Sequence, residues 1–134
     1  MPRSPHPSHR PTKIVELPDF EADAARLFNE PTLRALHLLL ADNPLAGTPV
    51  KDYPGLFELG FMNVRVVYTV SRKRPEIHLM GVLEGTTQLP PASSDEGKAL
   101  RKAVDSAVRV GLILGARALV KEIWEWLLEN VPFP

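Results

Sequence analysis

The chain has 134 residues, of which 44% are hydrophobic, and its 16 basic and 16 acidic side chains give a formal net charge of zero. This length suffices for one compact domain with a buried core, and the neutral balance argues against a protein devoted to nonspecific polyanion binding. The absence of cysteine excludes disulfides, zinc–thiolate sites and thiol nucleophiles, and it suits a cytoplasmic protein.

The N-terminal residues 1–12 are polar and rich in proline, which predicts a disordered leader because proline blocks helices and weakens strand pairing. This stretch has no apolar run of the kind found in secretory signals. The most apolar stretch, 110–116, is much shorter than the roughly 20 residues that a membrane span needs. We therefore expect no membrane association and a cytoplasmic location.

The next part of the chain predicts a strand followed by two helices. Residues 13–17 form the strand, which Pro18 should end, and Asp19 is a candidate cap for a helix over 20–28. A second helix over 32–42 repeats apolar residues along one stripe. The two helices are expected to form a helical hairpin.

A three-stranded antiparallel meander is predicted after a loop at 44–55. Apolar residues and a tight turn in 56–70 indicate two strands, and 76–82 indicates a third. A second loop over 86–97 precedes a helical signal at 98–130. Two glycines inside that signal favour a break near 110–115, so the C-terminal region is either one long helix or two shorter ones. The fold class is α+β.

The segment Gly-Leu-Phe-Glu-Leu-Gly-Phe-Met-Asn-Val-Arg-Val-Val-Tyr at 55–68, with this order of elements, resembles the RelE/ParE toxin superfamily of type II toxin–antitoxin systems. The resemblance covers residues 13–85. It implies a RelE/ParE-like core over 13–97, with 98–134 as a helical extension packed on the core or on a partner. It also implies a cognate antitoxin as partner. RelE-like members cleave mRNA on the ribosome, whereas ParE-like members inhibit DNA gyrase by protein contact.

Cleavage of RNA requires removal of a proton from the ribose hydroxyl, stabilisation of the phosphate and protonation of the leaving oxygen. Arg65 matches the middle-strand arginine that supports the scissile phosphate in RelE-like members. Other positions that are basic in ribonuclease members are acidic, apolar or glycine in this chain: Leu56, Glu58, Gly60, Glu84 and Gly85. A carboxylate about 4 Å from a phosphate repels it by about 1 to 4 kcal/mol.

The sequence therefore predicts a toxin-like protein that acts through protein binding, not catalysis. An mRNA endonuclease that uses Arg65 is the first alternative. A catalytically silent or self-inhibited scaffold is the second. Neither a cofactor nor a metal site is expected, since no phosphate-binding glycine loop and no zinc-ligand spacing occurs.

Four single features leave two readings each. Arg65 either contacts a phosphate or pairs with Glu58 across the hairpin. Glu58 and Glu84 are either a carboxylate pair for acid–base work or separate surface groups. His78 should face away from its neighbours in the strand and is either a general base or a structural residue. The dense basic cluster Arg72, Lys73 and Arg74 either contacts nucleic acid or is a solvated turn.

An apolar stripe marks the C-terminal region. Its main members are Ile123, Trp124, Leu127 and Leu128. At helical spacing such a stripe is normally part of the intramolecular core. The alternative is a partner-binding surface, because tryptophan is enriched in interface hot spots, and a homodimer through this helix is one form of it.

Overall fold

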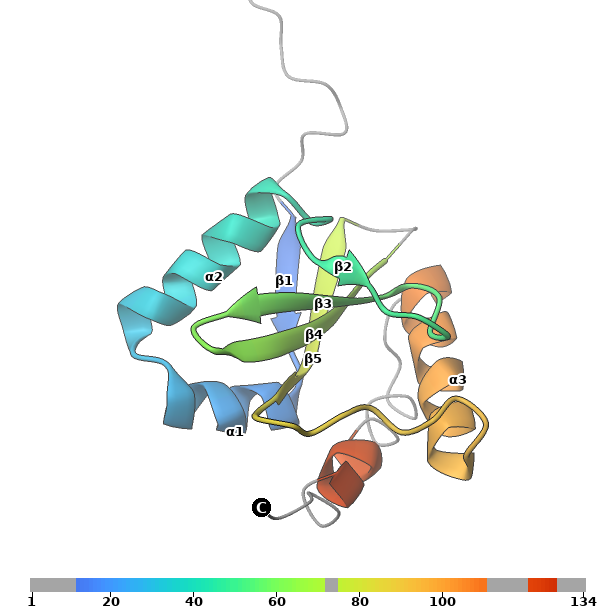
Figure 1. The fold of residues 1–134 in the computed structure, drawn as a ribbon. Coiled ribbons are helices and arrows are strands. Elements are labelled where there is room, and N and C mark those ends of the chain that lie inside the picture. Colours follow the sequence, from blue (N-terminus) through green and yellow to red (C-terminus); the bar gives the residue numbers. More distant parts are fainter. Residues whose placement is uncertain (1–11, 72–74, 111–120, 128–134) are drawn as a thin grey trace, which may run out of the picture.

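The computed structural model describes residues 12–71, 75–110 and 121–127. A five-stranded sheet in the order β1-β5-β4-β3-β2 lies at the centre of the molecule, with helices on both of its faces (Figure 1). The strands are β1 (Lys13–Glu16), β2 (Thr48–Pro49), β3 (Leu56–Phe61), β4 (Val64–Val70) and β5 (Glu76–Leu83). The predicted α+β class with its N-terminal strand, helical hairpin and antiparallel meander is confirmed.

The helical hairpin consists of α1 (Pro18–Leu27) and α2 (Glu30–Asp42). Pro18 opens α1, a position where its missing N–H would have had no partner within the helix. Leu17 is the N-cap and makes no side-chain capping bond, so the prediction that Asp19 caps this helix is wrong. The α2 helix is capped by Asn29, whose side chain accepts a hydrogen bond from the backbone N–H of Thr32 at 2.9 Å.

The meander has the predicted strands and a two-residue turn between β3 and β4. Met62 and Asn63 in that turn have φ values of 51° and 69°, as expected for a type I′ hairpin turn. The prediction that 44–55 is entirely loop is wrong at β2, which pairs antiparallel with Phe57 and Glu58 of β3. A two-residue edge strand gives little periodicity, and its proline is tolerated because it lies at the edge of the sheet.

The alternation of side chains along its strands divides the meander between two cores, and a bulge in β5 shifts that alternation. Val67 pairs with Gly81 and Tyr68 with Leu79, so Met80 is the extra residue. One core lies between the sheet and the α1–α2 hairpin, and its buried members include Phe20, Leu36 and Tyr68. The other core lies on the opposite face, against α3 (Asp95–Val110) and the helical residues 121–127.

The α3 helix and residues 121–127 are two helical segments. Leu100 of α3 and Trp124 belong to the same core cluster as Met80. In one straight helix they would be about 36 Å apart, at 1.5 Å per residue. The site of the predicted break, 110–115, lies almost wholly outside the described residues, as does nearly all of the predicted leader.

The division of the chain at residue 97 stays a prediction. The last described helices contribute to the same core as the meander, and α3 begins at Asp95, three residues before the expected start. Within 12–71, 75–110 and 121–127, no helix has the length and apolar character that crossing a membrane would require.

Candidate functional site

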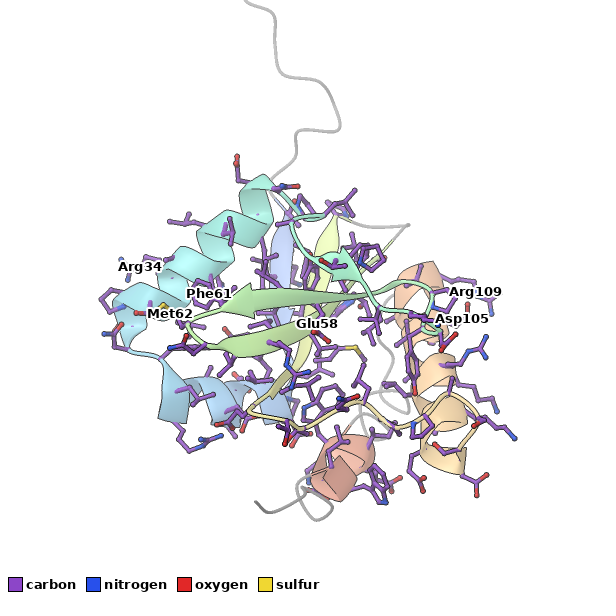
Figure 2. The ribbon with its side chains drawn as sticks, viewed as in Figure 1. Arg34, Glu58, Phe61, Met62, Asp105 and Arg109 are labelled. Atoms are coloured by element: carbon purple, nitrogen blue, oxygen red, sulfur yellow. The ribbon has the colours of Figure 1, made fainter. Side chains whose placement is uncertain are left out.

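The face of the sheet that carries Arg65 is the candidate site. Glu58 lies in the middle of β3 (Figure 2) and pairs with Val67 of β4, two residues from Arg65, so all three side chains project from one face. Glu58 and Arg65 line a shallow pocket of about 260 Å³ whose walls come from the loops around residues 51 and 90. Its charged lining residues are Lys51, Asp52, Glu58 and Arg65, so two cations face two carboxylates.

Arg65 uses its guanidinium to hold the loop that follows β5. Its Nη2 atom donates to the carbonyl oxygens of Gly85, at 3.0 Å, and of Thr87, at 2.5 Å. The strand register places Arg65 opposite Gly60, and Glu58 is not its partner in any ion pair formed within the described residues. The predicted Glu58–Arg65 ion pair is therefore not formed, because backbone carbonyls have taken its place.

Glu84 is turned away from this pocket toward α1. Its carboxylate accepts from Nη1 of Arg26 at 3.3 Å and from Nη2 at 2.5 Å, and Asp23 adds a contact at 3.2 Å. The hydrogen bonds, first with Glu84 and then with Asp23, raise the pKa of Arg26 above its already high ordinary value. Glu84 is thus a surface ion-pair partner, and Glu58 lines the pocket without it.

The histidine of β5 is structural. His78 is 1% exposed, with Nδ1 3.4 Å from the Thr69 hydroxyl and Nε2 3.2 Å from a carboxylate oxygen of Glu76. Ile77 and Leu79 enter the core on the other face, as the alternation predicts. A side chain this buried, with both ring nitrogens engaged, is not offered to a substrate.

Two tyrosines hold loops in place, Tyr53 at the pocket and Tyr68 on the opposite face of the sheet. Tyr68 stacks on Phe57 and ties down the loop before β2, since its hydroxyl donates to Pro44 O at 2.9 Å and accepts from Gly47 N–H at 2.8 Å. The Tyr53 hydroxyl donates to Pro90 O at 2.5 Å and so joins the two loops that form the pocket wall. Burial raises the pKa of both phenols. The role of Tyr53 was not predicted from the sequence, because no local pattern indicates a contact with a loop 37 residues away.

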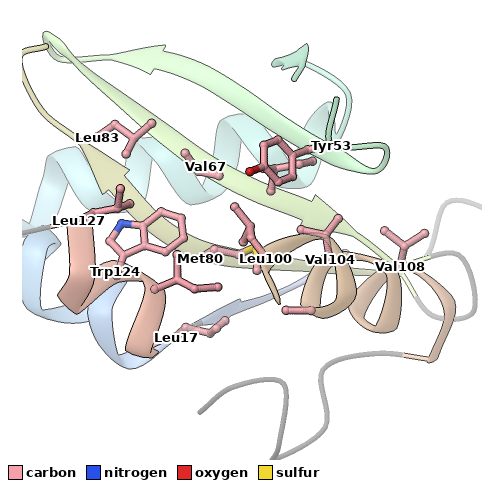
Figure 3. Close-up of a cluster of buried hydrophobic side chains, with 13 residues drawn as sticks. Leu17, Tyr53, Val67, Met80, Leu83, Leu100, Val104, Val108, Trp124 and Leu127 are labelled. Atoms are coloured by element: carbon pink, nitrogen blue, oxygen red, sulfur yellow. The ribbon is translucent and has the colours of Figure 1, made fainter. Parts of the chain in front are cut away.

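The C-terminal apolar stripe packs into the intramolecular core. Ile123, Trp124 and Leu127 are 3%, 2% and 5% exposed, and Figure 3 shows Trp124 and Leu127 gathered with Met80 and Leu83. The sheet face beside Arg65 is therefore filled by the chain itself. A partner-binding role for this stripe, which includes Leu128, stays a prediction. Leu128 and the basic cluster Arg72, Lys73 and Arg74 lie outside the described residues.

In the described part of the chain, no three histidine, aspartate or glutamate side chains cluster as metal ligands would. The charged groups that line the pocket are Lys51, Asp52, Glu58 and Arg65, and the guanidinium of Arg65 is hydrogen-bonded to two backbone carbonyls.

No family model and no curated protein matches the chain. Fourteen chains of solved structures do match. One comes from the toxin–antitoxin complex RelBE2 of Mycobacterium tuberculosis, with 16% identity, coverage of 57% of this chain and 100% of that chain, and a TM-score of 0.42. Another is a mutant of the E. coli toxin RelE in the free state, with 11% identity, coverage of 67% and 93%, and a TM-score of 0.47. At these identities the likeness to both structures is one of fold alone.

Proposed function

We propose that this chain is a toxin-like component of a type II toxin–antitoxin module, and that it acts by binding another protein and does not cleave RNA. The proposal that the chain does not cleave RNA rests on the hydrogen bonds of Arg65. Its Nη2 atom is committed to two backbone carbonyls, and Glu58 lines the same pocket.

Phosphoryl transfer depends on positive groups that are free to meet the charge developing in the transition state. The pocket offers Lys51 and Arg65 against Asp52 and Glu58, so its charges are balanced. A phosphate placed there would have only the Arg65 donors that the carbonyls of Gly85 and Thr87 do not use, and it would also meet the Glu58 carboxylate. These costs oppose RNA cleavage, whereas contact with a protein surface does not require free cations.

The expected partner is a cognate antitoxin. The M. tuberculosis structure that resembles this chain in fold is described as a toxin–antitoxin complex. Together with the resemblance carried by residues 55–68, this favours the same kind of partner here. The antitoxin would neutralise the toxin, and the toxin would act by binding a different protein.

Expression of the chain alone in a bacterium tests this proposal. We expect growth arrest with intact mRNA, and relief of the arrest when the neighbouring antitoxin gene is co-expressed. The Arg65→Gln variant should still arrest growth, provided that its thermal unfolding confirms a folded protein. Arg34→Gln is the matched control, because Arg34 is an exposed arginine of α2, which covers the sheet face opposite to Arg65, and within the described residues it pairs with Glu30.

Two results would contradict the proposal. Cleavage of ribosome-bound mRNA that disappears in Arg65→Gln and persists in Arg34→Gln would establish an endonuclease. Normal growth of cells that contain ample folded protein would exclude the toxin-like role and favour a catalytically silent scaffold.

A further inference from the structure

The outer face of α3 is a basic surface that the proposed function does not use. Its cations are Lys98, Arg101, Lys102 and Arg109, which at 3.6 residues per turn fall within an arc of about 100° on one side of the helix. All four are exposed, whereas the opposite side of α3 is buried in the core through Leu100, Ala103, Val104 and Ala107. Two carboxylates, Asp95 and Asp105, share the exposed side.

Most of these cations are not neutralised by their own chain. Arg109 pairs with Asp105 at 3.0 Å, one turn earlier in the helix. The ion pairs found in the described ranges include none with Lys98, Arg101 or Lys102. A run of three free cations within five residues is therefore left facing solvent.

A hollow lies beside the middle of this surface. Arg101, Lys102 and Asp105 line a pocket of about 230 Å³ together with Tyr53 and Pro54 of the neighbouring loop. Two adjacent basic side chains at its rim can donate hydrogen bonds to an anionic group that enters it. The Tyr53 ring is only 3% exposed, so it offers no face on which a base could stack.

We propose that this basic surface of α3 binds the sugar–phosphate backbone of duplex nucleic acid, with one phosphate held between Arg101 and Lys102. The distance from Lys98 to Arg109 along the helix is about 16 Å. That length matches about five phosphates of one strand, at about 3.4 Å of duplex axis for each. This contact depends on the charge of the phosphates and does not distinguish one base sequence from another.

An acidic protein segment fits this surface less well. Stable protein interfaces depend on buried aromatic or apolar anchors. The large hydrophobic side chains that are exposed in the described residues are Leu38, Leu39, Leu45 and Met62, and none of them belongs to α3. This face therefore offers a partner positive charge but no apolar anchor. Binding of a phosphate backbone requires positive charge and does not require an apolar anchor.

The test is binding of a mixed-sequence DNA duplex of about 20 base pairs, followed by fluorescence anisotropy between about 50 and 200 mM salt. We expect weak binding that falls with salt. The double variant Arg101→Gln/Lys102→Gln should lower affinity at least tenfold at low salt and reduce the salt slope by about 2, since each cation contributes about 0.9. Asp105→Asn should strengthen binding several-fold, because it removes a carboxylate and frees Arg109.

Arg34→Gln again provides the matched control, since it removes one exposed positive charge at the end of the molecule away from Arg109 (Figure 2) and should leave affinity unchanged. Absence of binding at the lowest salt, or an equal loss in Arg34→Gln and in the double variant, would overturn the proposal. Tighter binding of a polyglutamate peptide than of the duplex would also overturn it and point to an acidic protein. The result is independent of the growth experiment, which concerns Arg65.

Discussion

At the scale of single residues, the lack of a side chain at Gly81 allows Trp124 to pack directly against the sheet. A Cβ atom on Gly81 would overlap the indole of Trp124, which lies directly on the strand at that point. We expect Gly81→Ala to lower the free energy of unfolding by about 1 to 3 kcal/mol, because overpacking forces the indole or the strand to shift. Urea unfolding followed by far-UV circular dichroism measures this.

Gly60 of β3, which β4 separates from β5, provides the control for that substitution. A Cβ atom there would meet no atom within 4 Å, so Gly60→Ala should change stability by less than about 1 kcal/mol. An equal loss in the two variants would mean that strand conformation, and not contact with Trp124, sets the requirement for glycine at position 81.

The buried phenol of Tyr68 predicts a loss of stability at alkaline pH. The unfolded chain releases this proton near the ordinary pKa of 10.0, whereas burial raises the pKa in the folded protein. The folded state then binds more protons above pH 10, so the free energy of unfolding falls as pH rises, by up to about 1.4 kcal/mol per pH unit. Urea unfolding at a series of pH values should show this slope.

The Tyr68→Phe variant isolates the contribution of that phenol. It should be less stable than the parent near neutral pH by about 1 to 3 kcal/mol, because Pro44 O and Gly47 N–H lose their partner. Above pH 10 its stability should decline less steeply than that of the parent. An unchanged alkaline slope would show that other groups cause it.

At the scale of elements, the cap of α2 can be tested on its own. The Asn29 side chain accepts from Thr32 N–H, which satisfies one of the free donors at the start of the helix. Asn29→Ala should therefore cost about 0.5 to 2 kcal/mol, whereas Asn29→Asp keeps the acceptor and adds a charge that suits the helix N-terminus. Urea unfolding of the two variants measures the difference, and equal destabilisation by both would exclude the capping role.

The elements that the sequence predicted well are those with a strong local pattern. The hairpin of β3 and β4 follows from apolar spacing and a tight turn, which the structure places at Met62 and Asn63. The β2 strand and the start of α1 at Pro18 were missed, because a two-residue pairing and a helix without a side-chain cap leave little trace in the sequence.

At the scale of the whole molecule, the site depends on contacts between distant parts of the chain. Position 65 could be identified as an arginine on a middle strand, yet its partners lie 20 and 22 residues later in a loop. The stripe around Trp124 could be predicted as apolar, but only the folded chain shows that it covers the sheet. The sequence therefore indicates which residues are candidates, and long-range packing decides which of them are free to act.

That packing predicts that the described C-terminal helix unfolds together with the sheet. Both tryptophans of the chain, Trp124 and Trp126, lie in 121–127, so tryptophan fluorescence reports on this segment while far-UV circular dichroism reports on all helices and strands. Since Ile123, Trp124 and Leu127 are buried with Val67 and Met80, the two signals should give the same urea midpoint, as in a two-state transition. A fluorescence midpoint at lower urea would mean that the segment leaves the sheet separately and exposes an apolar face before the core unfolds.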